Sequence, residues 1–424
     1  MLPIPFAAQF MVRFQATKQQ KALRTILAKR PHRSKPCSTT SHGPPINPST
    51  GEIMKMNHMQ SNSKPTATAS MFRRALKRFA YICAAGTLLL TATSSWAAGT
   101  NNAYHWTNLV SDIAGVALRV DSNLVNPWGL AASATNTLWV ADNGTGVSTL
   151  YSTDGVPVPL VVIIPRSASN TDGANPTGTV FNSGSGFVVT HNGVSGPSIF
   201  IFVGEDGSIS GWNPDVSPDH AILAVDDGDE GAVYKGATLA STTGGDRLYV
   251  TNFHAGTVDV YDQNFMEVSG GFVDPTLPQG YAPFGIRNIN GFIYVTYAKQ
   301  DPDKHDDVPG PGHGFVSVFD TSGNFIRRLI SHGRLNSPWG LALAPQHFGI
   351  ASGSLLVGNF GNGRINAFNP TTGDGRGPLE QADGTPLAFD GLWALHFIDT
   401  SLFFTAGIAD EAHGLFGVIG ADTN

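Results

Sequence analysis

Short apolar runs separated by glycine-rich and polar turns dominate the chain after residue 98, and no sustained helical period interrupts them. An aromatic residue followed by glycine opens a strand-like run in "NPWGLAAS" (126–133), "APFGIRNI" (282–289) and "SPWGLALA" (337–344). Weaker copies of this run are "NPTGTVFN" (175–182), "YKGATLAS" (234–241) and "FDGLWALH" (389–396). Self-similarity of this kind is typical of repeat architectures.

Two further strand-like runs follow each of these openings. The second runs are "TLWVADN", "GFVVTHN", "RLYVTNF", "FIYVTYA", "SLLVGNF" and "SLFFTAG", and the third are "VSTLYSTDG", "SIFIFVGEDG", "TVDVYDQN", "FVSVFDTSG", "RINAFNPTTG" and "HGLFGVIG". The glycine landmarks at 129, 178, 236, 285, 340 and 391 lie 49, 58, 49, 55 and 51 residues apart. Six units of three or four short strands predict an all-β fold, a six-bladed β-propeller over residues 98–424. Residues 104–118 precede the first unit and are expected to supply the outer strand that the last unit lacks.

A signal peptide is predicted over residues 71–97. "MFRRALKRF" is a basic head, "AYICAAGTLLLTAT" is a short apolar stretch, and "SSWAAG" offers a small-residue cleavage site before Ala98. This pattern predicts a periplasmic or secreted protein. Residues 1–70 are basic and aperiodic, so we expect a disordered extension that is a gene-model artefact; the alternative is a cytoplasmic tail on a signal-anchor helix. A native N-terminus near Ala98 would distinguish the two.

Charge and cysteine content narrow the function. Residues 98–424 hold 12 of the 26 Lys and Arg but 31 of the 32 Asp and Glu, so this part should repel nucleic acid and anionic lipid. The two cysteines, Cys37 and Cys83, both precede Ala98, which excludes disulfides, thiolate catalysis and zinc–thiolate sites in the mature protein. Since no other apolar run approaches membrane-spanning length, we expect no stable membrane span, and we expect a monomer.

An acidic loop, "YAKQDPDKHDDVPGPGHGF" (297–315), stands out in a chain with 14% charged residues. Its candidate metal ligands are Asp301, Asp303, His305, Asp306, Asp307 and His313. Calcium takes carboxylate oxygens, whereas zinc and manganese also accept imidazole, so either kind of divalent cation is a candidate cofactor. The loop is not a helix-loop-helix calcium site, because Asp306 stands where glycine is required and Gly312 where a bidentate Glu belongs. A solvated acidic loop is the alternative.

Further candidates should share a face with this loop, because the turn between second and third strands lies at the end where each innermost strand begins. The ligand-binding candidates on this face are Trp128, Asn143, Asn192, Asn252, Phe284, Trp339 and Asn359. The candidate catalytic bases are His254, His313 and His413. For the asparagines, the alternative is a local role, since Asn before Gly is a favoured turn residue.

The landmarks resemble the NHL-type propeller pattern, in which P-x-G-I/L precedes an "IYVAD"-like strand. "NLVNPWGLA", "LWVADNGTGVSTLY", "LLVGNFGNGRINAF" and the acidic loop resemble more closely a largely uncharacterised family of exported bacterial propellers. Some members carry a C-terminal membrane-sorting tail that "GVIGADTN" does not match, so anchoring by that route is not expected. The resemblance implies fold and export but no reaction; NHL-type and gluconolactonase-like propellers hold a divalent ion with Glu, Asn and Asp ligands.

Two hypotheses for function follow. The first is a binding or scaffold module that presents its loop-rich face to a glycan, peptide or cell-surface protein. The alternative is a divalent-metal-dependent hydrolase or lyase, lactonase-like or NHL-lyase-like, with the ion in the central channel and a His base. The alternative expects His254, His313 and the asparagines within one coordination sphere. No G-x-S-x-G, H-E-x-x-H or phosphate-loop motif points to other chemistry.

Overall fold

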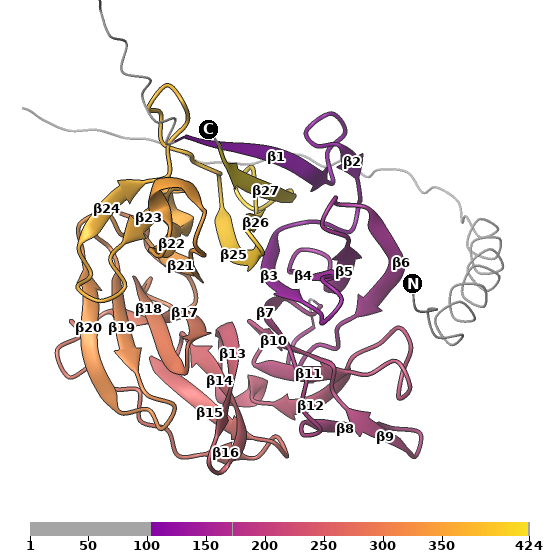
Figure 1. Ribbon diagram of the computed structural model, residues 1–424. Helices are drawn as coiled ribbons and strands as arrows, with labels where there is room; N and C mark the ends of the chain where they lie inside the picture. Colours follow the sequence, from indigo (N-terminus) through magenta and orange to yellow (C-terminus); the bar gives the residue numbers. More distant parts are fainter. Residues whose placement is uncertain (1–102, 172, 423–424) are drawn as a thin grey trace, which may run out of the picture. The chain divides into compact units, whose positions relative to one another are not determined.

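Six β-sheets are arranged around a common centre in the computed structural model, which describes residues 103–171 and 173–422 (Figure 1). The innermost strands contact one another in the order β3, β7, β13, β17, β21 and β25, and β25 returns to β3. This closed ring confirms the six-bladed propeller. Within the described ranges the only helices are short 3-10 turns: η1 (Gly228–Glu230), η2 (Gly349–Ala351) and η3 (Phe360–Asn362).

Five blades are four-stranded and run outward from the centre. The first contains β3 (Pro127–Ala132), β4 (Leu138–Asp142), β5 (Val147–Tyr151) and β6 (Pro157–Ile163). The second contains β7 (Pro176–Phe181), β10 (Phe200–Gly204), β11 (Ser208–Trp212) and β12 (Ile222–Asp226). The third contains β13 (Tyr234–Thr242), β14 (Gly245–Asn252), β15 (Thr257–Asp262) and β16 (Glu267–Val268). The fourth contains β17 (Tyr281–Ile289), β18 (Phe292–Lys299), β19 (Phe315–Phe319) and β20 (Phe325–Ser331). The fifth contains β21 (Pro338–Leu343), β22 (Leu355–Asn359), β23 (Ile365–Phe368) and β24 (Gly375–Pro378).

The sixth blade joins the two ends of the described chain. Its strands are β25 (Leu392–Ile398), β26 (Ser401–Ala406), β27 (Leu415–Ala421), β1 (Tyr104–Ser111) and β2 (Arg119–Val120). β1 pairs antiparallel with β27, from Tyr104 opposite Ala421 to Ser111 opposite Leu415. This pairing confirms that the segment before the first repeat supplies the missing outer strand.

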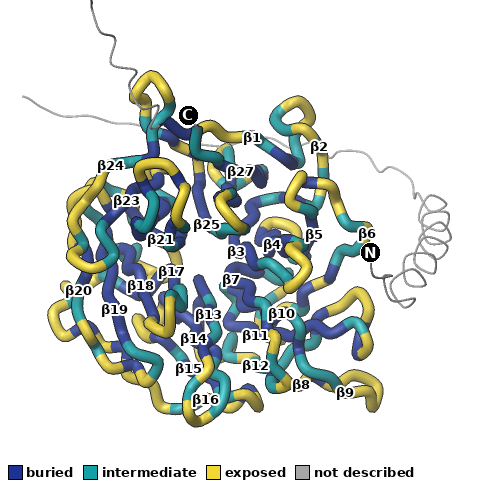
Figure 2. The backbone as a smooth tube through the Cα atoms, viewed as in Figure 1, coloured by how far each residue is buried: buried dark blue, intermediate teal, exposed yellow. Residues whose placement is uncertain are grey.

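Adjacent blades pack at backbone distance near the centre, where Figure 2 shows the strands buried and the outer turns exposed. A Cβ atom on Gly285 would lie 2.1 Å from the carbonyl oxygen of Trp339 in the next blade. Threonine hydroxyls add bonds between blades: Thr251 Oγ1 donates to the Phe284 carbonyl at 2.7 Å. Glycine is therefore required at Gly285, where two inner strands approach closely, as the repeat pattern predicted for this position.

The strand assignment of the second repeat was wrong. The run "GFVVTHN" forms β8 (Val188–His191), which pairs only with β9 (Val194–Pro197) in a separate hairpin, and the second strand of the blade is β10. The hairpin turns at Asn192 and Gly193, both with positive φ. An Asn-Gly pair between two apolar runs is a hairpin signal that the repeat pattern obscured.

The landmark of the sixth repeat was also misplaced by three residues. A Cβ on Gly340 would meet the carbonyl of Trp393, whereas a Cβ on Gly285 would meet that of Trp339. Trp393 is therefore the equivalent of Trp339, and Ala394, not Gly391, takes the landmark position. Alanine replaced the expected glycine, so the sequence alignment slid to a nearby glycine.

The predicted signal peptide (71–97) and N-terminal extension (1–70) lie outside the described residues. Within the residues that are described, no helix has the length and hydropathy needed to cross a membrane.

Candidate functional site

The innermost strands all begin at one face of the propeller. The side chains near the start of these strands, just before each landmark position, form the floor of the candidate site. Aromatic rings fill most of these positions: Trp393 stacks on Trp128 at 3.4 Å and on Phe360 at 4.1 Å between ring centroids. Phe284 and Trp339 also contact Trp393. We call these five rings the aromatic floor. The structure buries Trp128 and Phe284 within it, while Trp339 remains partly exposed.

In the third blade Lys235 stands just before the landmark Gly236, at the position that Trp128, Phe284, Trp339 and Trp393 take in four other blades. Its side chain is 1% exposed, and its ammonium lies 5.3 Å from the centroid of the Trp128 ring. The ammonium is paired with Glu205 and lies 3.3 Å from Asp306 Oδ1. Burial alone would lower the pKa of Lys235, but the charges of Glu205 and Asp306 outweigh it and raise the pKa. Lys235 is therefore a fixed cation rather than a free amine nucleophile.

Glu205 is held in place by a chain of hydrogen bonds from the first blade. It lies in the turn after β10, where its backbone N–H donates to the Asn175 carbonyl at 3.0 Å, next to the start of β7. Asn143 Nδ2 donates to Glu205 Oε2 at 2.8 Å, and Asn126 Nδ2 donates to Asn143 Oδ1 at 3.3 Å. Trp393 Nε1 donates to Asn126 Oδ1 at 3.2 Å. The aromatic floor thus orients the amides that orient Glu205.

The acidic loop folds back on itself and brings His305 and Asp306 to the same place. Gln300 and Asp307 form a β-bridge, and Asp301 Oδ1 accepts a hydrogen bond from the His305 backbone N–H at 2.9 Å. The His305 ring bonds through Nδ1 to Asp306 Oδ1 at 2.9 Å. This contact lowers the pKa of Asp306 to about 2 and raises the pKa of His305. Asp301 therefore has a structural role in positioning His305.

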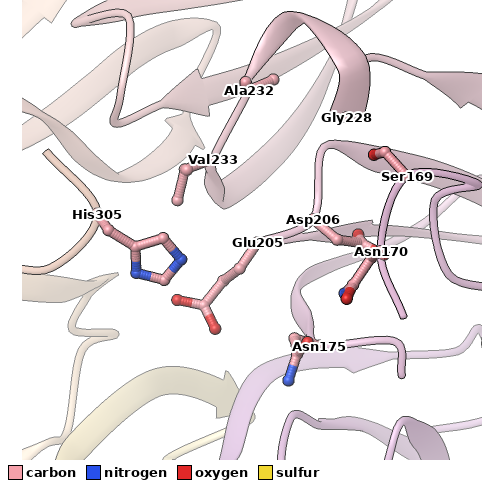
Figure 3. Close-up of a pocket in the computed structure, with 10 residues that line it drawn as sticks. Ser169, Asn170, Asn175, Glu205, Asp206, Gly228, Ala232, Val233 and His305 are labelled. Carbon is pink, nitrogen blue, oxygen red and sulfur yellow. The ribbon is translucent and has the colours of Figure 1, made fainter. Parts of the chain in front are cut away.

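Glu205, His305 and Asp306 form the one group of carboxylate and imidazole side chains, among residues 103–171 and 173–422, with ligand atoms all within 4.8 Å of one another. In Figure 3 the Glu205 carboxylate and the His305 ring point toward each other from opposite sides. Two carboxylates and an imidazole suit manganese or zinc better than calcium, which takes six to eight oxygens. Both contacts of the Asp306 side chain use Oδ1.

Two more carboxyl groups add negative charge beside this group. Burial, reinforced by the charge of Glu205, raises the pKa of Glu411 to about 7, while Asp306 and Asp307 act in the same direction and Lys235 opposes them. Burial, partly offset by Ser337, raises the pKa of Asp307 to about 6. Ala409, Asp410 and Glu411 all have positive φ, so a tight turn between β26 and β27 presents the Glu411 carboxyl to Asn126. Four acids thus surround one buried ammonium.

A cleft of about 410 Å³ opens beside the group (Figure 3). Its walls are mostly hydrogen-bonding side chains, from Ser169, Asn170, Asn175, Glu205, Asp206 and His305. This volume lies in the range of small-molecule sites, and the polar lining suits a hydroxylated or charged ligand.

The remaining asparagine candidates lie elsewhere or bond locally. Asn252 donates to Asp259 at 2.8 Å and accepts from nearby backbone N–H groups, and Asn359 donates to the Arg334 carbonyl at 2.8 Å. Asn192 is in the β8–β9 hairpin, at the far end of β7 from the site. Asn143 alone of the four candidates bonds to Glu205.

The structure does not bring the three candidate histidine bases into the group. His313 bonds through Nδ1 to the Val308 carbonyl at 2.8 Å within its own loop, and His413 contacts Asp112 at 2.6 Å. His254 is exposed in the turn after β14. Asp303 is exposed at the outer part of the acidic loop.

Sequence reasoning missed Glu205, Lys235, Asn126, Glu411 and Trp393. With "SIFIFVGEDG" read as a third strand, the Glu205 turn comes after that strand and is not among the turns predicted to share the candidate face. Lys235 had a readable signal: a charged residue stands just before the landmark glycine, where most of the other repeats have an aromatic ring. Trp393 was visible in "LWAL", which keeps the aromatic-small-Leu order of "PWGL".

Fold and site together define a six-bladed β-propeller with an acidic site at the mouth of its channel. No family model matches the chain. It is 37% identical over 325 residues to the uncharacterized protein L690 of Acanthamoeba polyphaga mimivirus, an alignment that covers 74% of this chain and 85% of that protein. Uncharacterized protein R648 of the same virus is 35% identical over 325 residues, 74% of this chain and 79% of that protein. The chain belongs to the same family as these proteins.

Solved propeller structures are similar at low sequence identity. A streptogramin B lyase has a TM-score of 0.42 at 12% identity, covering 75% of this chain and 98% of its own. A gluconolactonase from Xanthomonas campestris has a TM-score of 0.43 at 13% identity, covering 71% and 87%. The soluble aldose sugar dehydrogenase from Escherichia coli has a TM-score of 0.46 at 10% identity, covering 75% and 100%. These similarities are too distant for their activities to be carried to this protein.

Proposed function

We propose that the protein is a divalent-cation-dependent enzyme of the hydrolase or lyase type, acting on a small polar substrate in the cleft beside Glu205 and His305. The observation that carries the proposal is the convergence of Glu205 with His305 and Asp306, which come from different blades, at the edge of that cleft. A cation site requires ligands from separate segments to meet at one point, whereas a merely solvated acidic loop would not bring Glu205 of another blade to its side chains.

The donor set supports a manganese- or zinc-like cation held by Glu205, His305 and Asp306. When bound, such an ion supplies Lewis acidity toward a carbonyl and lowers the pKa of bound water. The Lys235 ammonium pairs with Glu205 and lies 3.3 Å from Asp306 Oδ1, so a bound cation would compete with it for these two carboxylates. The surplus of acids over the one buried ammonium favours uptake of a further cation.

The chain's own residues suit cation binding and substrate orientation. The His305 ring is 49% exposed at the cleft, and its Nδ1 is bonded to Asp306, which leaves Nε2 as the nitrogen able to bind the cation. Ser169, Asn175 and Asp206 offer hydrogen bonds to hydroxyl groups of a bound substrate. We therefore favour esters and lactones of hydroxylated acids as the first substrates to test.

The experiment is isothermal titration calorimetry of the full chain with manganese and with zinc. Hydrolysis assays on lactones and esters, with and without a chelator, follow it. We expect about one ion per chain, binding weakened at least tenfold in Glu205→Gln and His305→Ala, and turnover lost on chelation. Asp303→Asn is the matched control, since Asp303 is exposed in the same loop outside the group.

Equal affinity in the wild type and both variants would remove the proposed site. Cation binding at this site without turnover on any substrate would favour the binding module over the enzyme, with the ion ordering the loop for a glycan or protein partner.

A further inference from the structure

A second polar site lies inside the central channel, on the inner side of the aromatic floor. A cavity of about 30 Å³ is lined there by residues of the innermost strands, among them Gly129, Thr179, Arg287 and Leu395. Arg287 comes from β17, and its Nη2 donates to Nδ1 of His396 in β25 at 3.1 Å. The cavity holds one or two water-sized particles, since a single water needs at least about 10–15 Å³.

Among the described residues, Arg287 has no acidic partner. In the part of the chain that the structure describes, none of the ion pairs includes Arg287. His396 is neutral, because burial and the charge of Arg287 lower its pKa to about 3. Burial also lowers the pKa of Arg287, with no opposing carboxylate. An inward-facing cation without a negative partner is costly, so a bound anion would stabilise it.

An independent observation points to the same cavity. Thr179 is 7% exposed and lines the cavity, yet its Oγ1 has no hydrogen-bond partner among the described residues. Leaving a buried hydroxyl without a partner is unfavourable, and most such groups form a hydrogen bond. A hydroxyl donor and a guanidinium lining one small cavity are the donor set of an anion site.

We propose that Arg287 and Thr179 bind a small monovalent inorganic anion, of chloride size, inside the channel. The single uncompensated charge of Arg287 calls for one negative charge, and the cavity volume excludes sugar acids and hydrated phosphate. Arg287 remains partly exposed, which leaves a path for the ion to enter. This site is separate from the acidic site: the residues that line the cavity include none of Glu205, His305 and Asp306.

The test is thermal unfolding of the full chain at constant ionic strength while sodium chloride replaces sodium gluconate, whose anion is too large for the cavity. The wild type should gain several degrees with a saturable chloride dependence, as expected for a ligand that binds only the folded state. Arg287→Gln should lose this dependence, and Arg364→Gln, at an exposed arginine, should keep it.

Thr179→Val is a second variant in case Arg287→Gln does not fold, because valine preserves the shape and removes only the hydroxyl. It should shift the half-saturating chloride concentration upward at least threefold. Equal midpoints in chloride and gluconate for the wild type would show that water alone fills the cavity and would overturn the proposal. The proposal would also be overturned if Thr179→Val and Arg287→Gln, tested as single variants, both kept the chloride dependence of the wild type.

Discussion

Among the described residues, Lys235 is the cation buried among the acids of the site, so removing its charge should have a large effect on both stability and cation binding. In Lys235→Met the aliphatic stem is kept and the ammonium is lost. Glu205, whose side chain is 13% exposed, is left without its ion-pair partner. Breaking a buried pair on one side costs about 3–5 kcal/mol. The second pair adds little, about 1 kcal/mol at most, because Asp306 is 66% exposed.

A double-mutant cycle separates the pair from general damage to the core. Glu205→Gln alone should also destabilise the fold, because it leaves the Lys235 ammonium 1% exposed with Asp306 as its remaining partner. The double variant Lys235→Met/Glu205→Gln should return to within about 1 kcal/mol of the wild type, since neutral replacements of buried pairs are tolerated. The assay is guanidinium unfolding at pH 7.5. Additive single effects, or a Lys235→Met cost below about 1 kcal/mol, would refute the reasoning.

The same variant reports on the proposed cation site. A unit charge about 4 Å away is worth about 4 kcal/mol near a protein surface, and a divalent ion feels twice that. Removing the ammonium should therefore tighten manganese affinity at least tenfold, which needs only about 1.4 kcal/mol. Manganese should then raise the unfolding midpoint of Lys235→Met more than that of the wild type. A lower affinity in the variant would mean that Lys235 helps to build the site rather than competing with the ion.

Two further predictions concern single residues. Burial raises the pKa of Glu411 to about 7 from an ordinary 4.5, so its ionisation destabilises the folded state as pH rises from 4.5 through 7. In unfolding measurements, Glu411→Gln should therefore raise the free energy of unfolding by up to about 3 kcal/mol at pH 8 and leave it unchanged at pH 4. Equal stability of variant and wild type at pH 8 would contradict this. Gly285→Ala places a Cβ 2.1 Å from the Trp339 carbonyl and should cost about 1–3 kcal/mol or more, whereas Gly244→Ala, with its nearest contact at 3.4 Å, should cost less than about 1 kcal/mol; similar losses in the two variants would argue against close backbone packing as the cause.

The repeat pattern was sufficient to predict the blade number and the closure of the ring, because each blade repeats the same contacts with its neighbours. Errors arose where one unit departs from the pattern. The β8–β9 hairpin inserts an extra pair of strands into the second blade, and Ala394 replaces glycine in the sixth. Glycine spacing alone reveals neither the inserted hairpin nor the replacement of glycine by alanine.

The predicted face was right for the acidic loop, but the particular side chains were harder to name. His305 and Asp306 belong to the group, whereas Asp301 orients the loop backbone and His313 bonds within the loop. Lys235 and Glu205 are 30 residues apart in neighbouring blades, and their pairing depends on how far one blade rotates past the next. Sequence carries no direct record of that rotation, so convergence of residues from separate blades requires the structure.

The most direct test of the central claim is a crystal of the protein soaked in manganese, with anomalous diffraction to locate the ion. We expect one strong peak within metal-ligand distance of Glu205, His305 and Asp306, at the edge of the cleft in Figure 3. A peak at another acidic surface, or none at saturating manganese with the Lys235–Glu205 pair intact, would contradict it.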